Sequence, residues 1–200
     1  RPIIVTGAGV RISKSEILIK KIQKMLNIPI APSWATQDMW NSKRNYVVGS
    51  FGTHGTRAGN FIVQNSDLLI SIGARLSTRE TGSPLSSFAR DAKFVVVDID
   101  EYEIKKFNKF GKKVDISFNM DSRLFCQALI SKINKNIKKK YYKNWFNYIK
   151  NLKIKYPVVP KELINIKNTI NPYVFFNDLC FPSHVRLICN GNYFICLIRI

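Results

Sequence analysis

The sequence lacks any apolar run long enough to cross a membrane. A spanning helix needs roughly 20 consecutive apolar residues, and the longest candidates in these 200 residues are interrupted by Lys, Asn or Gly. The chain begins with Arg1 and shows no secretory signal peptide. These absences predict a cytoplasmic protein without membrane association, and the first residue indicates the interior of a longer reading frame.

Cysteine patterns that bind metals are also missing. The four cysteines show neither Cys-x-x-Cys spacing nor a His partner at a zinc-ligand interval; they are Cys126, Cys180, Cys189 and Cys196. Thiols of cytosolic proteins are kept reduced. We therefore expect four free thiols, and we predict no metal ligands from the sequence.

Acidic residues are scarce. The chain has 13 Asp and Glu against 32 Lys and Arg, which gives a net charge of +19. Alone, this excess would indicate nucleic-acid or anionic-membrane binding. Much of it is Lys mixed with Asn, Ile and Tyr within 132–155, a composition that AT-rich coding sequences also produce. Nucleic-acid binding is therefore the least favoured function, and it requires an affinity that falls steeply with salt.

Short β-branched runs alternate with helix-like segments over the first hundred residues, as in parallel βαβ architecture. Strands are predicted at 2–6, 28–31, 68–72, 93–97 and 114–117. Helices are predicted from Ser13, where Glu16 completes a capping-box pattern, and at 58–65, 102–107 and 122–133. This is an α/β fold: a parallel, Rossmann-like sheet with helices on both faces. Its strand-to-helix loops should share one edge, where open α/β sheets bind ligands.

Composition changes after this region. We predict a domain at 1–134, then a basic, solvated helix and linker at 135–170, where Pro157 and Pro160 end the helix. A new unit at 171–200 should open with a helix at 173–179 and a strand at 186–189. The segment after Ser183 should pack poorly, because one strand and a few residues cannot build a core.

Gly7-Ala8-Gly9 lies between the first strand and a helix, as a nucleotide-binding loop does. Glycine permits positive φ and allows a phosphate to approach backbone amides. The dinucleotide fingerprint also requires a third Gly, where this chain has Ile12, and an acidic residue after the second strand, where it has Ala31 and Pro32. These departures disfavour an NAD-dependent dehydrogenase.

A longer pattern runs from Gly49 to Gly82. It contains Gly-Ser-Phe-Gly-Thr-His-Gly-Thr, an apolar strand, and then Gly73-Ala74-Arg75; Val97-Asp98-Ile99-Asp100 follows later. In this order the motifs resemble the central domain of acetolactate synthase-like thiamine diphosphate enzymes, over roughly residues 1 to 130. Beyond the linker, 171–175 and 189–192 resemble the start of that family's thiamine diphosphate-binding domain. This second match is shorter, since the family usually has Gly at the position of Cys189.

The resemblance implies a parent enzyme that uses thiamine diphosphate and Mg²⁺ to decarboxylate a 2-keto acid and transfer the two-carbon unit, and that forms a homo-oligomer. The family's activating Glu lies in its first domain and its magnesium ligands deep in its third. We therefore name no catalytic or metal-binding residue and expect a fragment that is inactive alone. The central domain of some members holds FAD or an adenine nucleotide. The matching positions here are Gly7, Gly9, Gly52, His54, Gly55, Thr56, Gly73, Ala74, Arg75, Arg79, Asp98 and Asp100.

Each of these residues also has a purely structural interpretation. Gly7 and Gly9 could serve merely to shape a tight turn. Arg75 and Arg79 could serve merely to form ion pairs with Glu80 or Asp98. His54 could be a hydrogen-bonded loop residue without a catalytic role. The neighbouring aromatics should pack beneath that loop; they are Trp34, Trp40, Tyr46 and Phe51. The alternative function is a stand-alone nucleotide-binding or regulatory domain without turnover.

Overall fold

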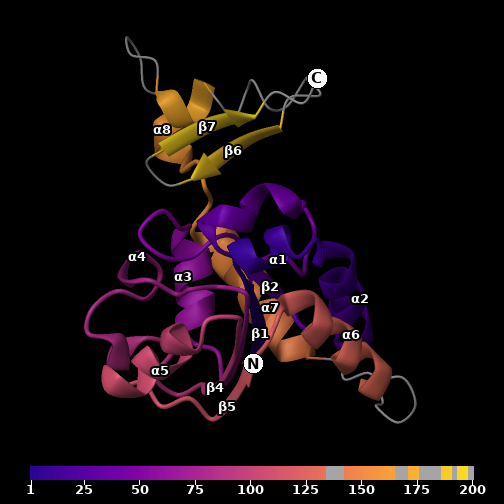
Figure 1. The fold of residues 1–200 in the computed structure, drawn as a ribbon. Helices are drawn as coiled ribbons and strands as arrows, with labels where there is room; N and C mark the ends of the chain where they lie inside the picture. Colours follow the sequence, from indigo (N-terminus) through magenta and orange to yellow (C-terminus); the bar gives the residue numbers. More distant parts are fainter. Residues whose placement is uncertain (134–141, 165–170, 176–185, 191–192, 198–200) are drawn as a thin grey trace.

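A computed structural model describes residues 1–133, 142–164, 171–175, 186–190 and 193–197. Its centre is a five-stranded sheet in the order β2-β1-β3-β4-β5, in which all neighbours are parallel (Figure 1). The strands are β1 Pro2–Thr6, β2 Ile30–Pro32, β3 Leu68–Ile72, β4 Lys93–Asp98 and β5 Ile116–Asn119. The predicted parallel α/β sheet is confirmed. The predicted second and fifth strands begin two residues too early.

Helices cover both faces of the sheet (Figure 1). The core on one face holds Ile4 of β1 with side chains of α1 Ala8–Ile12, α2 Glu16–Leu26 and α6 Ser122–Ile133. The core on the other face holds Ile3 and Val5 with side chains of α3 Arg57–Gln64, α5 Glu101–Lys109 and α7 Lys143–Lys155. Successive side chains of a strand point to opposite faces, so β1 supplies both cores and is buried throughout.

The first helix begins earlier than the sequence predicts. α1 starts directly after Gly7 and ends at Ser13, Lys14 takes a left-handed φ of 52°, and α2 begins at Glu16. Ser13 therefore ends one helix instead of starting another, and the predicted capping box with Glu16 is wrong. The same Ser-x-x-Glu pattern does act at residues 77–80, where the Ser77 N–H donates to Glu80 Oε2 at 2.9 Å before α4 Thr78–Thr81.

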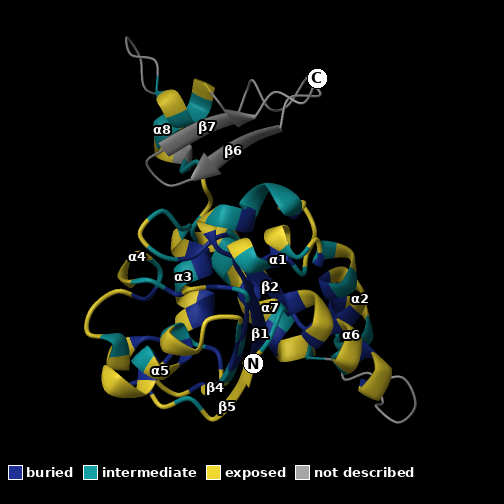
Figure 2. Cartoon of the chain, viewed as in Figure 1, coloured by how far each residue is buried: buried dark blue, intermediate teal, exposed yellow. Residues whose placement is uncertain are grey.

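The basic helix after residue 134 is not simply solvated. Along α7, Trp145 is 4% and Ile149 1% exposed, and both belong to the core that α3 also lines. The Trp145 Nε1–H donates to the carbonyl of Pro2 at 3.0 Å. Figure 2 shows α7 within the body of the domain, next to the buried strand β1 with which it shares a core. The expectation of a solvated helix is therefore wrong for one side of α7, while the domain boundary itself stays a prediction.

The remaining elements are short. They are the 3₁₀ helices Trp34–Met39 (η1) and Leu85–Ser87 (η2), the helix α8 Lys161–Ile164, and the strands β6 Arg186–Asn190 and β7 Tyr193–Leu197. β6 confirms the predicted strand at 186–189, and β7 pairs with it antiparallel. Residues 172–175 are helical, as predicted for 173–175, and 176–179 lie outside the described residues. How the segment after Ser183 packs stays a prediction. Within the described ranges, no helix has the length and apolarity needed to span a membrane.

We predict that Trp145→Ala lowers the free energy of unfolding by about 3–5 kcal/mol, because it removes a large buried side chain and its hydrogen bond to Pro2. Ile154→Ala on the same helix is the control; Ile154 is 68% exposed, and its loss should cost about 0.5 kcal/mol or less. Urea unfolding measures both. Equal stability of the two variants would contradict the packing of α7 into the core.

Candidate functional site

The loops at the carboxyl ends of the strands are joined by backbone hydrogen bonds. The Gly7 N–H, after β1, donates to the carbonyl of Ile72 at 3.2 Å, and the Gly9 N–H donates to Gly73 at 2.9 Å. The Gly73 N–H, after β3, donates to Val97 of β4 at 2.9 Å. This edge therefore carries the first and third predicted loops as one hydrogen-bonded unit.

The glycines of these loops allow backbone to lie directly on backbone. A Cβ added at Gly7 would lie 2.4 Å from the Ala74 Cα, and one at Gly9 would lie 2.8 Å from the Gly73 Cα. Real Cβ atoms do not approach so closely, so any larger residue would push the loops apart. The N–H groups of Gly7, Gly9 and Gly73 already donate to protein carbonyls. This geometry favours the turn-shaping interpretation, and phosphate approach through these glycines stays a prediction.

The second predicted loop precedes α3. Thr56 caps this helix, since its Oγ1 accepts a hydrogen bond from the Gly59 N–H at 2.9 Å. Gly52 has a φ of +91°, which disfavours residues with a Cβ, and its carbonyl accepts a hydrogen bond from the Gly55 N–H at 2.9 Å. Gly55 is itself confined, because a Cβ there would lie 2.5 Å from Phe51. The sequence pattern thus encodes a tight turn that leads into a capped helix.

His54 lies at the tip of this loop. Its ring is 6.4 Å from the ring of Trp34, centroid to centroid. Trp40 and Phe51 are buried and Tyr46 is partly buried, as expected for packing beneath the loop. Trp34 is 50% exposed and departs from that expectation. It offers an accessible aromatic face beside His54.

Arg79 is brought to the second loop through its backbone. The N–H and the Oγ1 of Thr53 both donate to the Arg79 carbonyl, at 2.7 and 2.9 Å. The Arg79 side chain is exposed and forms no ion pair with any residue that the structure describes. The proposed pairing with Glu80 or Asp98 is not observed; the Glu80 carboxylate accepts the Ser77 N–H instead. Arg79 therefore presents a guanidinium to solvent at the candidate site.

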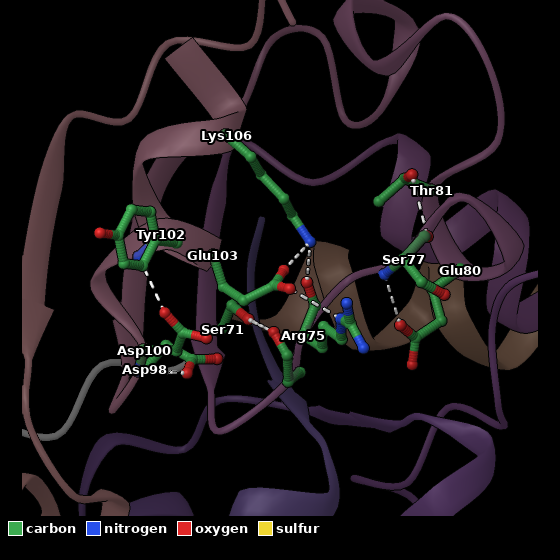
Figure 3. A network of polar contacts seen from close by, with 11 residues as sticks. Ser71, Arg75, Ser77, Glu80, Thr81, Asp98, Asp100, Tyr102, Glu103 and Lys106 are labelled. Atoms are coloured by element: carbon green, nitrogen blue, oxygen red, sulfur yellow. Dashed lines mark hydrogen bonds and ion pairs between the residues drawn. The ribbon is translucent and has the colours of Figure 1, made fainter. Parts of the chain in front are cut away.

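Arg75 pairs with a residue that sequence reasoning missed. Its Nε lies 2.8 Å from Glu103 Oε1 of α5, and Lys106 contacts the same carboxylate. The Lys106 Nζ also donates to the Arg75 carbonyl at 2.6 Å (Figure 3). Arg75 remains 76% exposed, so this pair contributes little stability, about 0–1 kcal/mol. Only the position of Glu103 within the first turn of α5 hints at this contact in the sequence.

Two aspartates, Asp98 at the end of β4 and Asp100 just after it, shape the start of α5 (Figure 3). Asp98 Oδ1 accepts the Asp100 N–H at 3.0 Å, and Asp100 Oδ1 accepts the Tyr102 N–H at 2.9 Å as the N-cap. Both lie at the same carboxyl edge as Gly73. Their structural role is established by these bonds, and contact with a ligand stays a prediction.

Cys126 on α6 is fully buried, and burial raises the pKa of its thiol to about 12. A thiol in this state is unreactive, in keeping with the expected free, reduced cysteine. Cys180 lies outside the described residues. In the described ranges, no group of three or more His, Cys, Asp or Glu residues is placed to hold a metal ion.

A five-stranded parallel sheet with helices on both faces and glycine-rich loops at its carboxyl edge defines a Rossmann-like α/β domain. The family model described as "Thiamine pyrophosphate enzyme, central domain" matches residues 1–129. The chain therefore belongs to the acetolactate synthase-like thiamine pyrophosphate enzymes, and the resemblance carried by the sequence motifs is confirmed.

Curated relatives extend the match beyond the central domain. A probable acetolactate synthase large subunit of Methanococcus aeolicus is 34% identical over 84% of this chain, and the acetolactate synthase large subunit of Cyanidium caldarium is 31% identical over 88%. A 3D-(3,5/4)-trihydroxycyclohexane-1,2-dione hydrolase of Clostridium botulinum is 27% identical over 89%. The matches cover 28%, 31% and 27% of these relatives. The chain thus spans less than a third of their length.

Proposed function

We propose that this chain is the central part of a thiamine diphosphate-dependent enzyme that decarboxylates a 2-keto acid and transfers the two-carbon unit, as an acetolactate synthase does. The alignments with two acetolactate synthase large subunits support this assignment, since they extend past the central domain over 84% and 88% of the chain. The homo-oligomeric state of the parent enzyme belongs to the same proposal.

Thiamine diphosphate in such an enzyme supplies the carbanion-stabilising chemistry, and Mg²⁺ anchors its diphosphate. The resemblance assigns the groups that hold and activate them to the other domains of the enzyme. This chain contributes a different ligand site to the enzyme, at the carboxyl edge of its sheet. The observation that carries the proposal is the exposed Arg79 side chain. Thr53 holds the backbone of this residue by donating a hydrogen bond to its carbonyl.

We propose that this edge binds an adenine-containing nucleotide, FAD or ADP. The guanidinium groups of Arg79 and Arg75 suit the diphosphate, because charge-assisted contacts to phosphate are strong and often bidentate. Asp98 and Asp100 lie at the neighbouring strand end, where they would face the adenosine. The residues fit such a ligand through their side chains, since the N–H groups of Gly7, Gly9 and Gly73 are engaged by protein carbonyls.

Arg79→Ala should weaken FAD or ADP binding by roughly tenfold to a hundredfold, since loss of a charge-assisted contact costs about 1.5–3 kcal/mol. Calorimetry on wild type and variant measures the change. Arg90→Ala is the matched control: Arg90 is also exposed, but it precedes β4 at the opposite edge of the sheet, so its loss should leave the affinity unchanged. Equal affinities for Arg79→Ala and wild type would remove Arg79 from the site, and no heat with either ligand would leave the domain a scaffold.

The alternative function is nucleotide binding by a stand-alone or regulatory domain. It uses the same site, but the domain would then not be part of a thiamine diphosphate-dependent enzyme. Under either function the 200-residue chain should release no product from pyruvate with thiamine diphosphate and Mg²⁺ present. Turnover needs a carboxylate that promotes ylide formation and a metal that anchors the diphosphate. A coupled assay, with a full-length acetolactate synthase as positive control, measures this. Product above background would overturn the assignment of catalysis to other domains.

A further inference from the structure

The side chain of Asn60 binds both backbone polar groups of one loop residue. Its Oδ1 accepts the Gly52 N–H at 2.7 Å, and its Nδ2 donates to the Gly52 carbonyl at 3.1 Å. An amide side chain in this arrangement replaces the paired N–H and C=O of a neighbouring strand. Asn60 thus holds Gly52 from the first turns of α3.

The helix that carries Asn60, α3, is tightly packed. On α3, Ile62 and Val63 are at most 1% exposed, and a Cβ added at Gly59 would lie 2.1 Å from the Ser50 carbonyl oxygen. The helix is therefore pressed against the start of the loop and cannot shift without disturbing the core. Whatever Asn60 binds is fixed relative to the sheet.

The contacts of Asn60 continue to Arg79 through Gly52 and Thr53. A Cβ added at Gly52 would lie 2.7 Å from the Arg79 carbonyl oxygen and 2.8 Å from the Glu80 Cα, so the loop and the α4 turn touch there. The next residue, Thr53, donates its N–H and its Oγ1 to that carbonyl. A continuous series of contacts therefore runs from Asn60 through Gly52 and Thr53 to Arg79.

We propose that Asn60 is the positioning residue of the nucleotide site: it holds the loop of residues 52–56 against the turn that carries Arg79. The inference rests on the proposed nucleotide site for its functional meaning and on the hydrogen bonds above for its mechanism. Other bonds of the loop, from Gly55 to Gly52 and from Thr56 to Ser50, close the loop on itself, and the Thr56 Oγ1 accepts the Gly59 N–H of α3. They do not attach Gly52 to α3.

Hydrogen exchange and ADP calorimetry on Asn60→Leu test this role. Leu is close to Asn in size and removes both bonds to Gly52, so the amides of Gly52 and Thr53 should exchange about tenfold faster or more. Affinity for ADP should fall about tenfold, while the amides of β1 and β3 stay protected. Asn60→Asp keeps the acceptor and loses the donor, so its amide exchange and ADP affinity should lie between those of the wild type and Asn60→Leu. This variant also provides the test if Asn60→Leu does not fold.

Asn65→Ala is the matched control. Asn65 ends the same helix, and its Nδ2 donates to the Phe61 carbonyl at 2.8 Å, away from the loop, so exchange at Gly52 and Thr53 should not change. Unchanged exchange in both Asn60 variants would overturn the positioning role, and so would faster exchange with unchanged ADP affinity. A wild-type chain that binds neither ADP nor FAD would refute the nucleotide site alone, because the exchange rates would still decide whether Asn60 positions the loop.

Discussion

The architecture of the carboxyl edge depends on one constraint, the direct contact of two backbone segments. The turn Gly7–Gly9 lies on the segment Gly73–Ala74 so closely that a Cβ at Gly7 would approach the Ala74 Cα to 2.4 Å. Hydrogen bonds from Gly7 to Ile72 and from Gly9 to Gly73 fix the contact. β1 and β3 are neighbours in the sheet, so this contact joins the loops that follow them, and Arg75 comes directly after it in the chain.

The candidate site is assembled around this contact from segments far apart in the sequence. The second loop leads into α3, and it meets the α4 turn at Arg79. α5 supplies Glu103, which holds the Nε of Arg75. Helices pack on both faces of the sheet, and backbone hydrogen bonds join the loops to one another and to the strand ends. The exposed side chains of Arg75 and Arg79 both belong to these loops.

The sequence predicted the parallel sheet and its family correctly because both signals are local. β-branched runs such as 68–72 mark buried strands, and the motif around His54 is specific enough to identify a family. The errors arose where tertiary contacts decide the outcome. Ser13 and Glu16 match a capping box, yet Ser13 ends α1; α7 reads as a basic, solvated helix, yet Trp145 enters the core and bonds to Pro2. The partner of Arg75 is another such contact, because Glu103 meets it only across the folded edge.

The backbone contact between the two loops is tested most directly by the stability of Gly9→Ala. The added Cβ would lie 2.8 Å from the Gly73 Cα, so the loops must separate, and we predict a loss of about 1–3 kcal/mol in the free energy of unfolding. Ala8→Ser alters the exposed neighbouring residue and should change stability by about 0.5 kcal/mol or less. Urea unfolding with an unchanged m value compares the two. A Gly9→Ala midpoint equal to that of the wild type would contradict the account.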